Sequence, residues 1–402
     1  MHNQDYPIAR RKQESRVVSL KIVQIIPALD AGGAERTVVE ITGAVVAAGG
    51  QALIISAGGR LEEEIRALGG EIVHLPVDSK NPYVMWRNAN RIASIAREFG
   101  ADLLHARSRA PAWSTRAASK QIDLPFITTY HGTYRTGGVL KRRYNAIMAS
   151  GDAVIANSGF IARRIISQHG IADDRITIIP RGVPPLYFEV PEAVTSPAQF
   201  LLDHGLPKDR PVDEPLIVLP GRLTRGKGQE IAIEALAQLH SQNDKAHLVL
   251  AGDSQGRKRY VKGLHQQIAR AKIADYVHFC GHVQDMAALY ACADIVLSAS
   301  TVPEAFGRIA VESQASARMI VASAHGGALE TITNEQTGFH FEPANAADLA
   351  AVLKKVMMLD TAPHKQMRLA GRKHVRAHYS REAMCVKTLG VYRDLISPHE
   401  GR

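Results

Sequence analysis

Two glutamates stand eight residues apart in the stretch SASTVPEAFGRIAVE, residues 298–312. The preceding run, ACADIVLSAS, is short, apolar and rich in Ile and Val, which favours a buried strand, and GRIAVESQASA from Gly307 onward favours a helix. Glu304 would then lie in a loop at the carboxyl end of a strand, where open α/β sheets bind ligands. Glu312 would lie about two turns into the helix, roughly 10 Å away. Two carboxylates at that separation suit the hydroxyl groups of an extended ligand.

Both glutamates also have ordinary structural interpretations. Thr301-Val302-Pro303-Glu304 fits a helix capping box, in which Glu304 would satisfy a backbone N–H. Glu312 could equally be a solvent-facing helix residue. Because short motifs are weak evidence alone, the choice depends on other features of the chain.

A glycine-rich loop, GRLTRGKG at residues 221–228, follows the predicted strand PLIVLPG. It resembles a Walker A motif, but Gly228 stands where the magnesium-binding Ser or Thr should be, and no Walker B strand is evident. Arg222 offers a bidentate fork and Lys227 a point charge. The loop therefore predicts a grip on a diphosphate, with a solvated surface loop as the alternative.

Two further loops carry paired glycines. The first, DAGGAE at residues 30–35, contains Gly32 and Gly33 at a predicted helix start, where the backbone could approach a phosphate or a sugar. It lacks the GxGxxG spacing, and the second strand ends without an acidic residue, so a nicotinamide-dependent enzyme is disfavoured. The second, HGGA at residues 325–328, fits helix packing as well as ligand contact.

His131 is a candidate for a role in the same cleft. It follows the strand PFITTY, so it would project from the carboxyl end of the first sheet; an isolated histidine is more often structural. The chain has no Asp-x-Asp and no HExxH. We therefore expect no metal, and a departing diphosphate would be neutralised by Arg222, Lys227 and helix N-termini.

Length and composition indicate a globular protein of two or three domains. The chain has 402 residues, of which 46% are hydrophobic and 22% charged. Its three cysteines lack CxxC spacing, which is consistent with a reducing compartment. The polar N-terminus does not resemble a secretory signal, and the uncharged window at 41–59 is interrupted by glycines, so a membrane span is disfavoured. We expect a cytoplasmic protein.

The formal net charge is +10, with a pI near 9.5. Solvated faces are the default explanation for the basic clusters of the first half, but together they favour an acidic substrate or peripheral contact with an anionic membrane at its inner face. Nucleic acid is disfavoured because no nucleic-acid motif accompanies the charge. The clusters are Arg10-Arg11-Lys12, Lys141-Arg142-Arg143 and Arg163-Arg164.

Apolar runs alternate with helical patterns through most of the chain, which predicts βαβ units and parallel sheets covered on both faces. Seven predicted strands, from KIVQIIPAL to RITIIP, precede a proline-marked segment that predicts a hinge. Five more follow, from PLIVLPG to MIVASA. Beyond about Asn345 the chain reads as helices, the last from about Arg381 to Ile396.

Together, PEAFGRIAVE, GRLTRGKG, the GGAE loop and TTYHG resemble the family 4 retaining glycosyltransferases of the GT-B fold, from about Lys21 to Tyr392. The resemblance implies an α/β protein with two doubly wound, Rossmann-like domains that face each other across a cleft. The expected segments are a basic tail (1–20), an acceptor-binding domain (21–195), a hinge (196–214), a nucleotide-sugar-binding domain (215–378) and a C-terminal helix that crosses back to the first domain (379–402).

The same resemblance assigns roles in the second domain. It implies that Glu304 contacts hydroxyls of the donor sugar and that Glu312 holds the ribose. Arg222 and Lys227 match the diphosphate clamp. Backbone N–H groups around Phe306 and Gly307 match contacts from the helix start to the sugar or phosphate.

In the first domain, the resemblance implies that the loop with Gly32 and Gly33 closes over the donor and that His131 lies near the transferred sugar. Arg181-Gly182-Val183 stands where many relatives have Asn-Gly-Val.

The implied reaction is sugar transfer from a nucleotide-diphosphate sugar, as co-substrate, to a glycan or glycolipid such as a lipopolysaccharide core, with no cofactor. Because no second carboxylate is placed as a nucleophile, we expect same-face attack, with the departing phosphate accepting the proton. The alternatives are a nucleotide-sugar epimerase of the same architecture and a non-catalytic nucleotide-sugar-binding protein.

Overall fold

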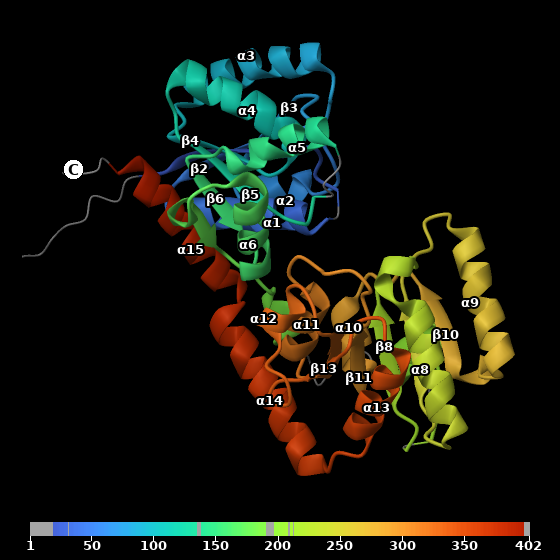
Figure 1. The fold of residues 1–402 in the computed structure, drawn as a ribbon. Helices are drawn as coiled ribbons and strands as arrows, with labels where there is room; N and C mark the ends of the chain where they lie inside the picture. The colour runs from blue at the N-terminus through green and yellow to red at the C-terminus, as the bar shows by residue number, and fades with distance from the viewer. Residues whose placement is uncertain are drawn as a thin grey trace, which may run out of the picture.

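The computed structural model describes residues 19–30, 32–134, 138–189, 197–207, 210–211 and 213–397. Within them the chain forms two lobes, each a parallel sheet with helices packed on it, and the last helix returns to the first lobe (Figure 1). The predicted architecture of two doubly wound domains is confirmed. The Arg10-Arg11-Lys12 cluster of the predicted tail lies outside the described residues.

The first lobe has a seven-stranded sheet in the order β3-β2-β1-β4-β5-β6-β7. Every strand falls within a predicted apolar run, because strands of a parallel sheet that is covered on both faces are apolar on both sides. The strands are β1 (Lys21–Ile25), β2 (Gln51–Ser56), β3 (Glu71–His74), β4 (Leu103–Ala106), β5 (Phe126–Tyr130), β6 (Ala153–Ala156) and β7 (Ile176–Ile178). The helices are α1 (Gly33–Ala47), α2 (Glu62–Ala67), α3 (Pro82–Phe99), α4 (Arg109–Ile122), α5 (Val139–Asn145) and α6 (Gly159–His169).

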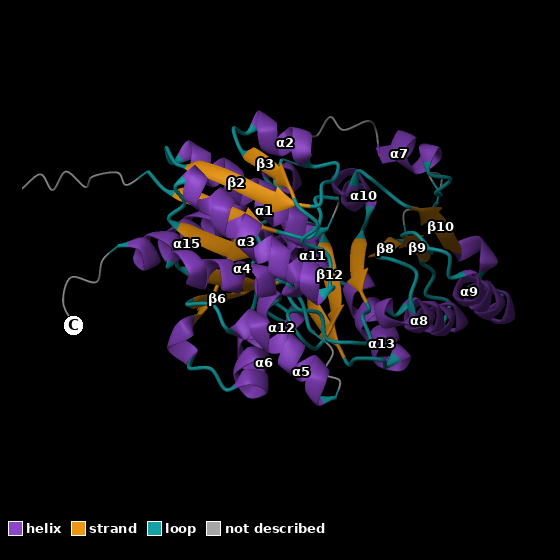
Figure 2. Ribbon diagram, turned by 90° about the horizontal axis from the view of Figure 1, so that it is seen from above, coloured by secondary structure: helices purple, strands orange, loops and turns teal. Residues whose placement is uncertain are grey.

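Successive side chains of β1 enter two different cores. Ile22 packs in the core that includes Tyr392 of the last helix, α15 (Arg381–Ile396). Val23 packs on the other face, in the core that includes Ile92 of α3. This alternation follows from the two-residue period of a strand. It explains why α15, which lies beside α1 in Figures 1 and 2, belongs structurally to the first lobe.

The second lobe has a six-stranded sheet in the order β10-β9-β8-β11-β12-β13. Its strands are β8 (Leu216–Pro220), β9 (His247–Ala251), β10 (Val277–Gly281), β11 (Ile295–Ser298), β12 (Met319–Ser323) and β13 (Phe339–Phe341). Its helices are α7 (Pro197–Asp203), α8 (Gln229–Ser241), α9 (Lys258–Ala271), α10 (Met286–Cys292), α11 (Arg308–Ala315), α12 (Ala328–Thr331), α13 (Ala346–Met357) and α14 (Thr361–His378). Only β13 has no counterpart among the predicted strands, because FHF is flanked by Gly338 and Glu342 and is not part of a longer apolar run.

The segment predicted as a hinge at 196–214 contains helix α7. Phe200 of α7 packs in the core that α10 and α11 share. Val183 and Phe188, which follow β7, pack in the same core. The described part of this connection is therefore anchored on the second lobe.

The chain passes between the lobes twice, after β7 and again just before α15, and the two segments pair with each other. Val183 forms a parallel bridge with Ser380, just before α15. Gly182 lies so close to this segment that an added Cβ would stand 2.4 Å from the Cα of Arg381. A larger side chain could not be accommodated without moving backbone, so the crossing requires glycine at this position.

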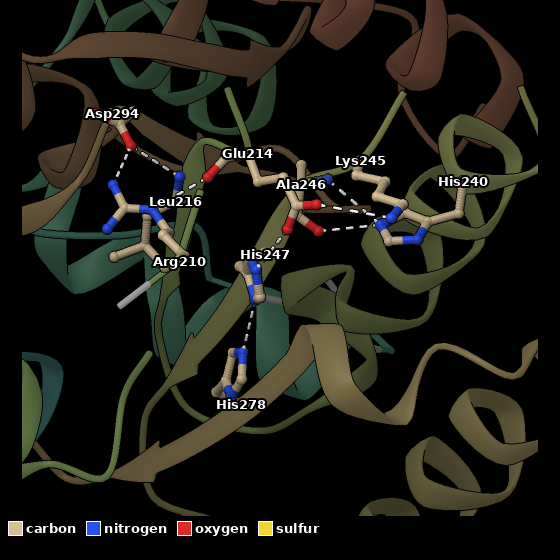
Figure 3. Close-up of polar contacts among 9 residues, drawn as sticks. All are labelled: Arg210, Glu214, Leu216, His240, Lys245, Ala246, His247, His278 and Asp294. Carbon is tan, nitrogen blue, oxygen red and sulfur yellow. Dashed lines mark hydrogen bonds and ion pairs between the residues drawn. The ribbon is translucent and has the colours of Figure 1, made fainter. Parts of the chain in front are cut away.

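A polar network fixes the amino-terminal edge of the second sheet (Figure 3). The Arg210 guanidinium donates to Asp294 (2.6 Å), just before β11. The Glu214 carboxylate lies 3.1 Å from Nε2 of His247, and Nδ1 of that ring lies 3.1 Å from Nε2 of His278. These contacts tie the entry into β8 to β9 and β10, at the edge opposite the carboxyl-end loops.

Candidate active site

The loops after β8 and β11 form one unit at the carboxyl edge of the second sheet. β8 and β11 are parallel neighbours, with β9 on the other side of β8. The order of the strands therefore reverses here, at the position where open α/β sheets hold ligands. Thr301 donates from its N–H to the Gly226 carbonyl (3.1 Å) and from its hydroxyl to the Arg225 carbonyl (3.2 Å), so the loops are joined directly.

Lys227 and Glu304 form an ion pair between these two loops. The Lys227 ammonium donates to Oε1 of Glu304, and the Ser300 hydroxyl donates to the same oxygen. Burial alone would raise the pKa of Glu304, but the charge and hydrogen bond of Lys227, with Ser300, outweigh it and the pKa is lowered. Glu304 is therefore ionised, and its other oxygen remains available to accept a hydrogen bond.

The capping-box interpretation of Glu304 is wrong. The N-cap of α11 is Gly307, three residues later, with φ +82°. Glu304 bonds to side chains of its own and the neighbouring loop instead. Within the described residues, the N–H groups of Phe306 and Gly307 have no hydrogen-bond partner, as is usual at a helix start. The Phe306 side chain is buried in the core, so only its backbone faces the loop.

The loop at 325–328 packs against the backbone of the loop that carries Glu304. The N–H of Gly327 donates to the Glu304 carbonyl (2.9 Å), and His325 Nε2 lies 2.8 Å from the Ser300 carbonyl. A Cβ on Gly326, where φ is +61°, would stand 2.5 Å from the Glu304 carbonyl. These paired glycines therefore serve close backbone packing that positions Glu304.

Sterics explain why glycine, and not the Ser or Thr of a Walker A motif, occupies position 228. Its φ is +73°, and a Cβ would stand 1.8 Å from the carbonyl oxygen of Ala299. No side chain fits there, because the loop passes directly over the end of β11. The short 3₁₀ turn Arg225–Lys227 before it aims Lys227 at Glu304.

Arg222 differs from Lys227 in its surroundings. Its residue is exposed, while its carbonyl accepts a hydrogen bond from Gln229 (3.1 Å) at the start of α8. No described carboxylate forms an ion pair with its guanidinium. The backbone of Arg222 is fixed, and the side chain keeps its donors available to a ligand.

Glu312 is buried, so its interpretation as a solvent-facing helix residue is wrong. Only 6% of the residue is exposed. Arg308, one turn earlier, donates to Oε1 from Nε (3.0 Å) and Nη2, and the Tyr290 hydroxyl donates to Oε2 (3.2 Å). The Glu312 charge, acting against burial, raises the pKa of Arg308. Arg308 therefore keeps its charge beside the Glu312 carboxylate.

The glycine loop of the first lobe meets arginines from outside its own sheet. A Cβ on Gly33 would stand 2.2 Å from Nη1 of Arg181 and 3.1 Å from Nη1 of Arg308. A Cβ on Gly32 would stand 2.0 Å from the Glu35 carboxylate. The loop thus reaches Arg308 of the second lobe, and through it the neighbourhood of Glu312.

His131 directly follows β5 and carries unpaired polar atoms. Both ring nitrogens are buried and, among the described residues, have no hydrogen-bond partner. Its carbonyl accepts from Nη2 of Arg181 (3.1 Å) and Nδ2 of Asn157 (3.3 Å). Burial first, and then the charges of Arg181 and Arg107, hold the pKa of His131 well below its usual range. The ring is therefore neutral, and one nitrogen can accept from a hydroxyl while the other donates.

Two contacts beside this cluster join the lobes. The Ser158 hydroxyl donates to the Ala305 carbonyl (2.5 Å), next to Glu304. Glu330 of α12 accepts from backbone N–H groups at the start of α6. The structure thus brings Lys227 together with Glu304, and links Gly33 and His131 through Arg181.

Two hollows flank the glycine-rich loop at residues 221–228, on the side of α9. One, of about 890 Å³, is lined by Arg225 and by the basic start of α9, residues 257–263. The other, of about 640 Å³, is lined by Leu223, Phe279 and residues 252–254 among others. The basic lining places further positive charge beside the loop that carries Lys227.

In the described part of the chain, no group of three or more His, Cys, Asp or Glu side chains could hold a metal ion. Likewise, no helix among the described residues is both long and apolar enough to cross a membrane.

Comparison with known proteins identifies the family. The model for Glycosyltransferase Family 4 matches residues 31–185, and the model for Glycosyl transferases group 1 matches residues 207–374. A solved glycosyltransferase from Rickettsia africae is 34% identical, covers 95% of this chain and 100% of its own, and has a TM-score of 0.86. The chain belongs to the family 4 glycosyltransferases.

Two more distant proteins are also similar to this chain. A glycosyltransferase of Methanocaldococcus jannaschii is 28% identical over 307 residues, which are 73% of this glycosyltransferase and 75% of the relative. The structure of Anabaena HepE in complex with UDP has a TM-score of 0.80 at 23% identity and covers 94% of this chain and 100% of its own. At that identity the likeness shows the shared fold, GT-B, and no more.

Two residues of the candidate site were not predicted from the sequence. Arg308 stands four residues before Glu312, a spacing that pairs opposite charges on a helix and could have been recognised. Arg181 gave no local signal, because its contacts with Gly33 and His131 are long-range. Its position where many relatives carry Asn was the one available indication.

Proposed function

We propose that this glycosyltransferase moves a sugar from a nucleotide-diphosphate sugar to a glycan or glycolipid acceptor, with retained anomeric configuration and without a metal or cofactor. The Lys227–Glu304 pair carries this proposal. It sets a cation suited to a diphosphate beside an ionised carboxylate suited to sugar hydroxyls, at the strand-order reversal of the second sheet. The UDP held by Anabaena HepE supports a nucleoside diphosphate as the leaving group.

Each candidate residue has a role in this scheme. Lys227 and the exposed Arg222 neutralise the diphosphate, together with free N–H groups at Phe306 and Gly307. Glu304 holds donor-sugar hydroxyls. Glu312, already fixed by Arg308 and Tyr290, presents its remaining lone pairs to the ribose.

The first lobe completes the site. The loop with Gly32 and Gly33 closes over the donor, because it already touches Arg308 of the second lobe. Neutral His131 orients the transferred sugar through its two unpaired nitrogens. A neutral ring serves better than a cation here, since it can both donate to and accept from a hydroxyl.

The chemical step follows from these positions. The bond between the anomeric carbon and the diphosphate oxygen breaks, and the acceptor oxygen bonds to the same face of that carbon. The departing diphosphate oxygen takes the acceptor's proton. Stabilising the charge that develops on the leaving group is the main contribution of Lys227 and Arg222.

The positive charge of the first half supports an acceptor that carries phosphate. The first half carries the basic clusters at 141–143 and 163–164. These favour a phosphorylated glycolipid of the cell envelope, such as a lipopolysaccharide core, met at the inner face of the cell membrane. The family assignment leaves the epimerase and the non-catalytic binding protein without supporting observations.

A panel of nucleotide sugars tests the proposal. Donor hydrolysis and thermal stabilisation are measured for each, and the anomeric configuration of the product is read by NMR. We expect one donor class to stabilise the protein and to give a retained product at undiminished rate in chelator. An inverted product, a glycosylated enzyme side chain, or activity lost in chelator and restored by magnesium would overturn the mechanism.

A further inference from the structure

Three helices of the first lobe carry most of the chain's excess positive charge. α3, α4 and α5 each contain three Lys or Arg residues, and the only carboxylate among them is Glu98 at the end of α3. Among the described residues none of these nine cations forms an ion pair. The formal net charge of the whole chain is +10. The excess is therefore concentrated on these three helices of the first lobe; Figure 1 shows α3 and α4 at its top and α5 below them.

The same helices expose the chain's only two tryptophans. Trp86 is 62% exposed and Trp113 is 36% exposed, and Tyr83 beside Trp86 is 63% exposed. Aromatic side chains usually bury most of their large apolar surface, so three of them exposed on adjacent helices need a partner. Tryptophan and tyrosine concentrate at membrane–water interfaces, because their apolar rings carry a polar group.

The exposed aromatics are held in place as one surface. The Ser114 hydroxyl of α4 donates to the Met85 carbonyl of α3 (2.9 Å), which joins the helix that carries Trp113 to the helix that carries Trp86. The Trp113 ring stacks on Tyr144 of α5 at 6.3 Å, and its Nε1 donates to the carbonyl of that residue (3.3 Å). The face is thus pre-ordered rather than loose.

α5 adds aliphatic groups next to cations. Val139 is 84% exposed and Leu140 is 86% exposed, the highest values among the exposed large hydrophobics. The next three residues, Lys141, Arg142 and Arg143, are also exposed. Aliphatic side chains flanked by cations are the pattern of segments that lie in the interface of an anionic bilayer.

We propose that this surface, the aromatic–basic face, docks on a bilayer that contains anionic lipids. It consists of Tyr83, Trp86, Arg87, Trp113, Val139, Leu140, Lys141, Arg142 and Arg143. A soluble polyanion would satisfy the cations but would leave Val139 and Leu140 in water. A bilayer surface satisfies both, because anionic headgroups lie directly above an apolar layer.

Docking also sets the direction from which an acceptor arrives. α5 begins eight residues after His131, and Arg109 at the start of α4 lies 4.4 Å from the ring centroid of Tyr134, between His131 and α5. The acceptor side of the cleft is therefore next to the docked helices. This second step rests on the proposed function, whereas docking itself does not.

Flotation of the full chain with vesicles tests docking. Vesicles of phosphatidylcholine are compared with vesicles that also contain phosphatidylglycerol. We expect binding to the anionic vesicles alone, with a blue shift of the intrinsic fluorescence, because both tryptophans of the chain lie on the face. Replacing Lys141, Arg142 and Arg143 by Gln should weaken binding at least tenfold. The double variant Val139→Ser with Leu140→Ser should abolish the blue shift.

Matched controls separate this face from general charge and hydrophobicity. Replacing Lys258, Arg259 and Lys262 of α9 by Gln removes as many cations from the second lobe, and Leu369→Ser with Val386→Ser removes two exposed apolar groups from α14 and α15. Both controls should bind as the unaltered chain does. Equal loss in variant and control, or equally tight binding to soluble polyphosphate, would overturn the proposal.

Donor hydrolysis without vesicles distinguishes the two proposals. The double variant Val139→Ser with Leu140→Ser should hydrolyse donor at the unaltered rate. Hydrolysis without vesicle binding would refute docking and leave the proposed function standing. Vesicle binding with no turnover of any nucleotide sugar would refute the proposed function alone.

Discussion

The carboxylate of Glu330, in the second lobe, caps the helix that begins at Gly159 in the first. Its oxygens accept hydrogen bonds from the N–H groups of Gly159 (2.7 Å) and Phe160 (2.5 Å), and Arg163 lies 3.1 Å away. A negative charge at a helix N-terminus is stabilising, because the first N–H groups have no partner in the helix. This cap therefore holds the lobes together beside the cleft.

We expect Glu330→Gln to loosen the lobes. The amide loses the charge and one acceptor oxygen, which should cost about 1 kcal/mol of the contact between the lobes. Hydrogen exchange at the amides of residues 159 and 160 should become faster, and small-angle scattering should report a larger radius of gyration. Glu335→Gln is the control, because Glu335 pairs with Lys355 at an exposed site. Unchanged exchange at residues 159 and 160 would contradict the cap.

Glu304→Gln should lower turnover and spare nucleotide binding. The amide keeps the shape of the carboxylate but loses the charge that Lys227 stabilises, so it holds the sugar hydroxyls less firmly in the transition state. We expect kcat to fall roughly 100-fold. The affinity for the nucleoside diphosphate, measured by calorimetry, should change little. Glu234→Gln on the exposed face of α8 should leave both values unchanged. A normal turnover rate in Glu304→Gln would refute the assignment.

Lys227→Met should give the opposite pattern. Removing the ammonium takes away a charge that meets the diphosphate, and the pKa of Glu304 should rise because only Ser300 and His325 then oppose the effect of burial. Nucleoside diphosphate affinity should fall at least tenfold. Lys355→Met, which breaks an exposed ion pair, serves as the control. Equal affinity in the two variants would place the diphosphate elsewhere.

The sequence positions of most strands could be predicted, because the strands of a parallel sheet that is covered on both faces are apolar runs, and such runs can be recognised locally. β13 could not, because its three residues lie outside any longer apolar run. Helix α7 was hidden by the prolines around it, and its packing on the second core is a long-range property.

Within the site, the loops that carry the candidate residues could be predicted, but the contacts between those residues could not. Glu304 and Lys227 were both placed at loop ends, but their ion pair joins residues 77 positions apart in the sequence. The burial of Glu312 follows from its contact with Tyr290 of α10, which no local pattern announces. Arg181 depends on the way the chain crosses between the lobes. Such contacts arise from tertiary packing, so sequence alone left each glutamate with two interpretations.

The histidines in Figure 3 predict that acid weakens the second lobe. Burial, and then His247, lower the pKa of His278 to about 4, whereas an unfolded chain titrates near 6.5. Between these values the unfolded chain binds a proton that the folded chain does not. The free energy of unfolding is therefore fully retained above about pH 6.5 and falls as the pH drops toward 4.

Melting temperature as a function of pH tests this for His278→Gln. The variant should lose less stability than the unaltered chain between pH 6.5 and 4, because the titrating ring is gone. His282→Gln, at an exposed position just beyond β10, is the control and should follow the unaltered profile. A profile of His278→Gln parallel to that of the unaltered chain would show that other groups govern the acid transition.

Gly228 and Gly226, in one loop, should respond oppositely to the same substitution. A Cβ on Gly228 would stand 1.8 Å from the Ala299 carbonyl at a φ of +73°, whereas the nearest atom to a Cβ on Gly226 is a Val302 methyl at 3.4 Å. Gly228→Ala must shift the backbone that aims Lys227, so we expect a loss of roughly 1–3 kcal/mol in unfolding free energy and weaker nucleotide binding. Gly226→Ala should change stability by less than about 1 kcal/mol, since 3.4 Å is an ordinary contact. Denaturant unfolding and calorimetry of both variants decide the matter: equal losses would mean that the loop, and with it the aim of Lys227, is not set by the close passage over β11.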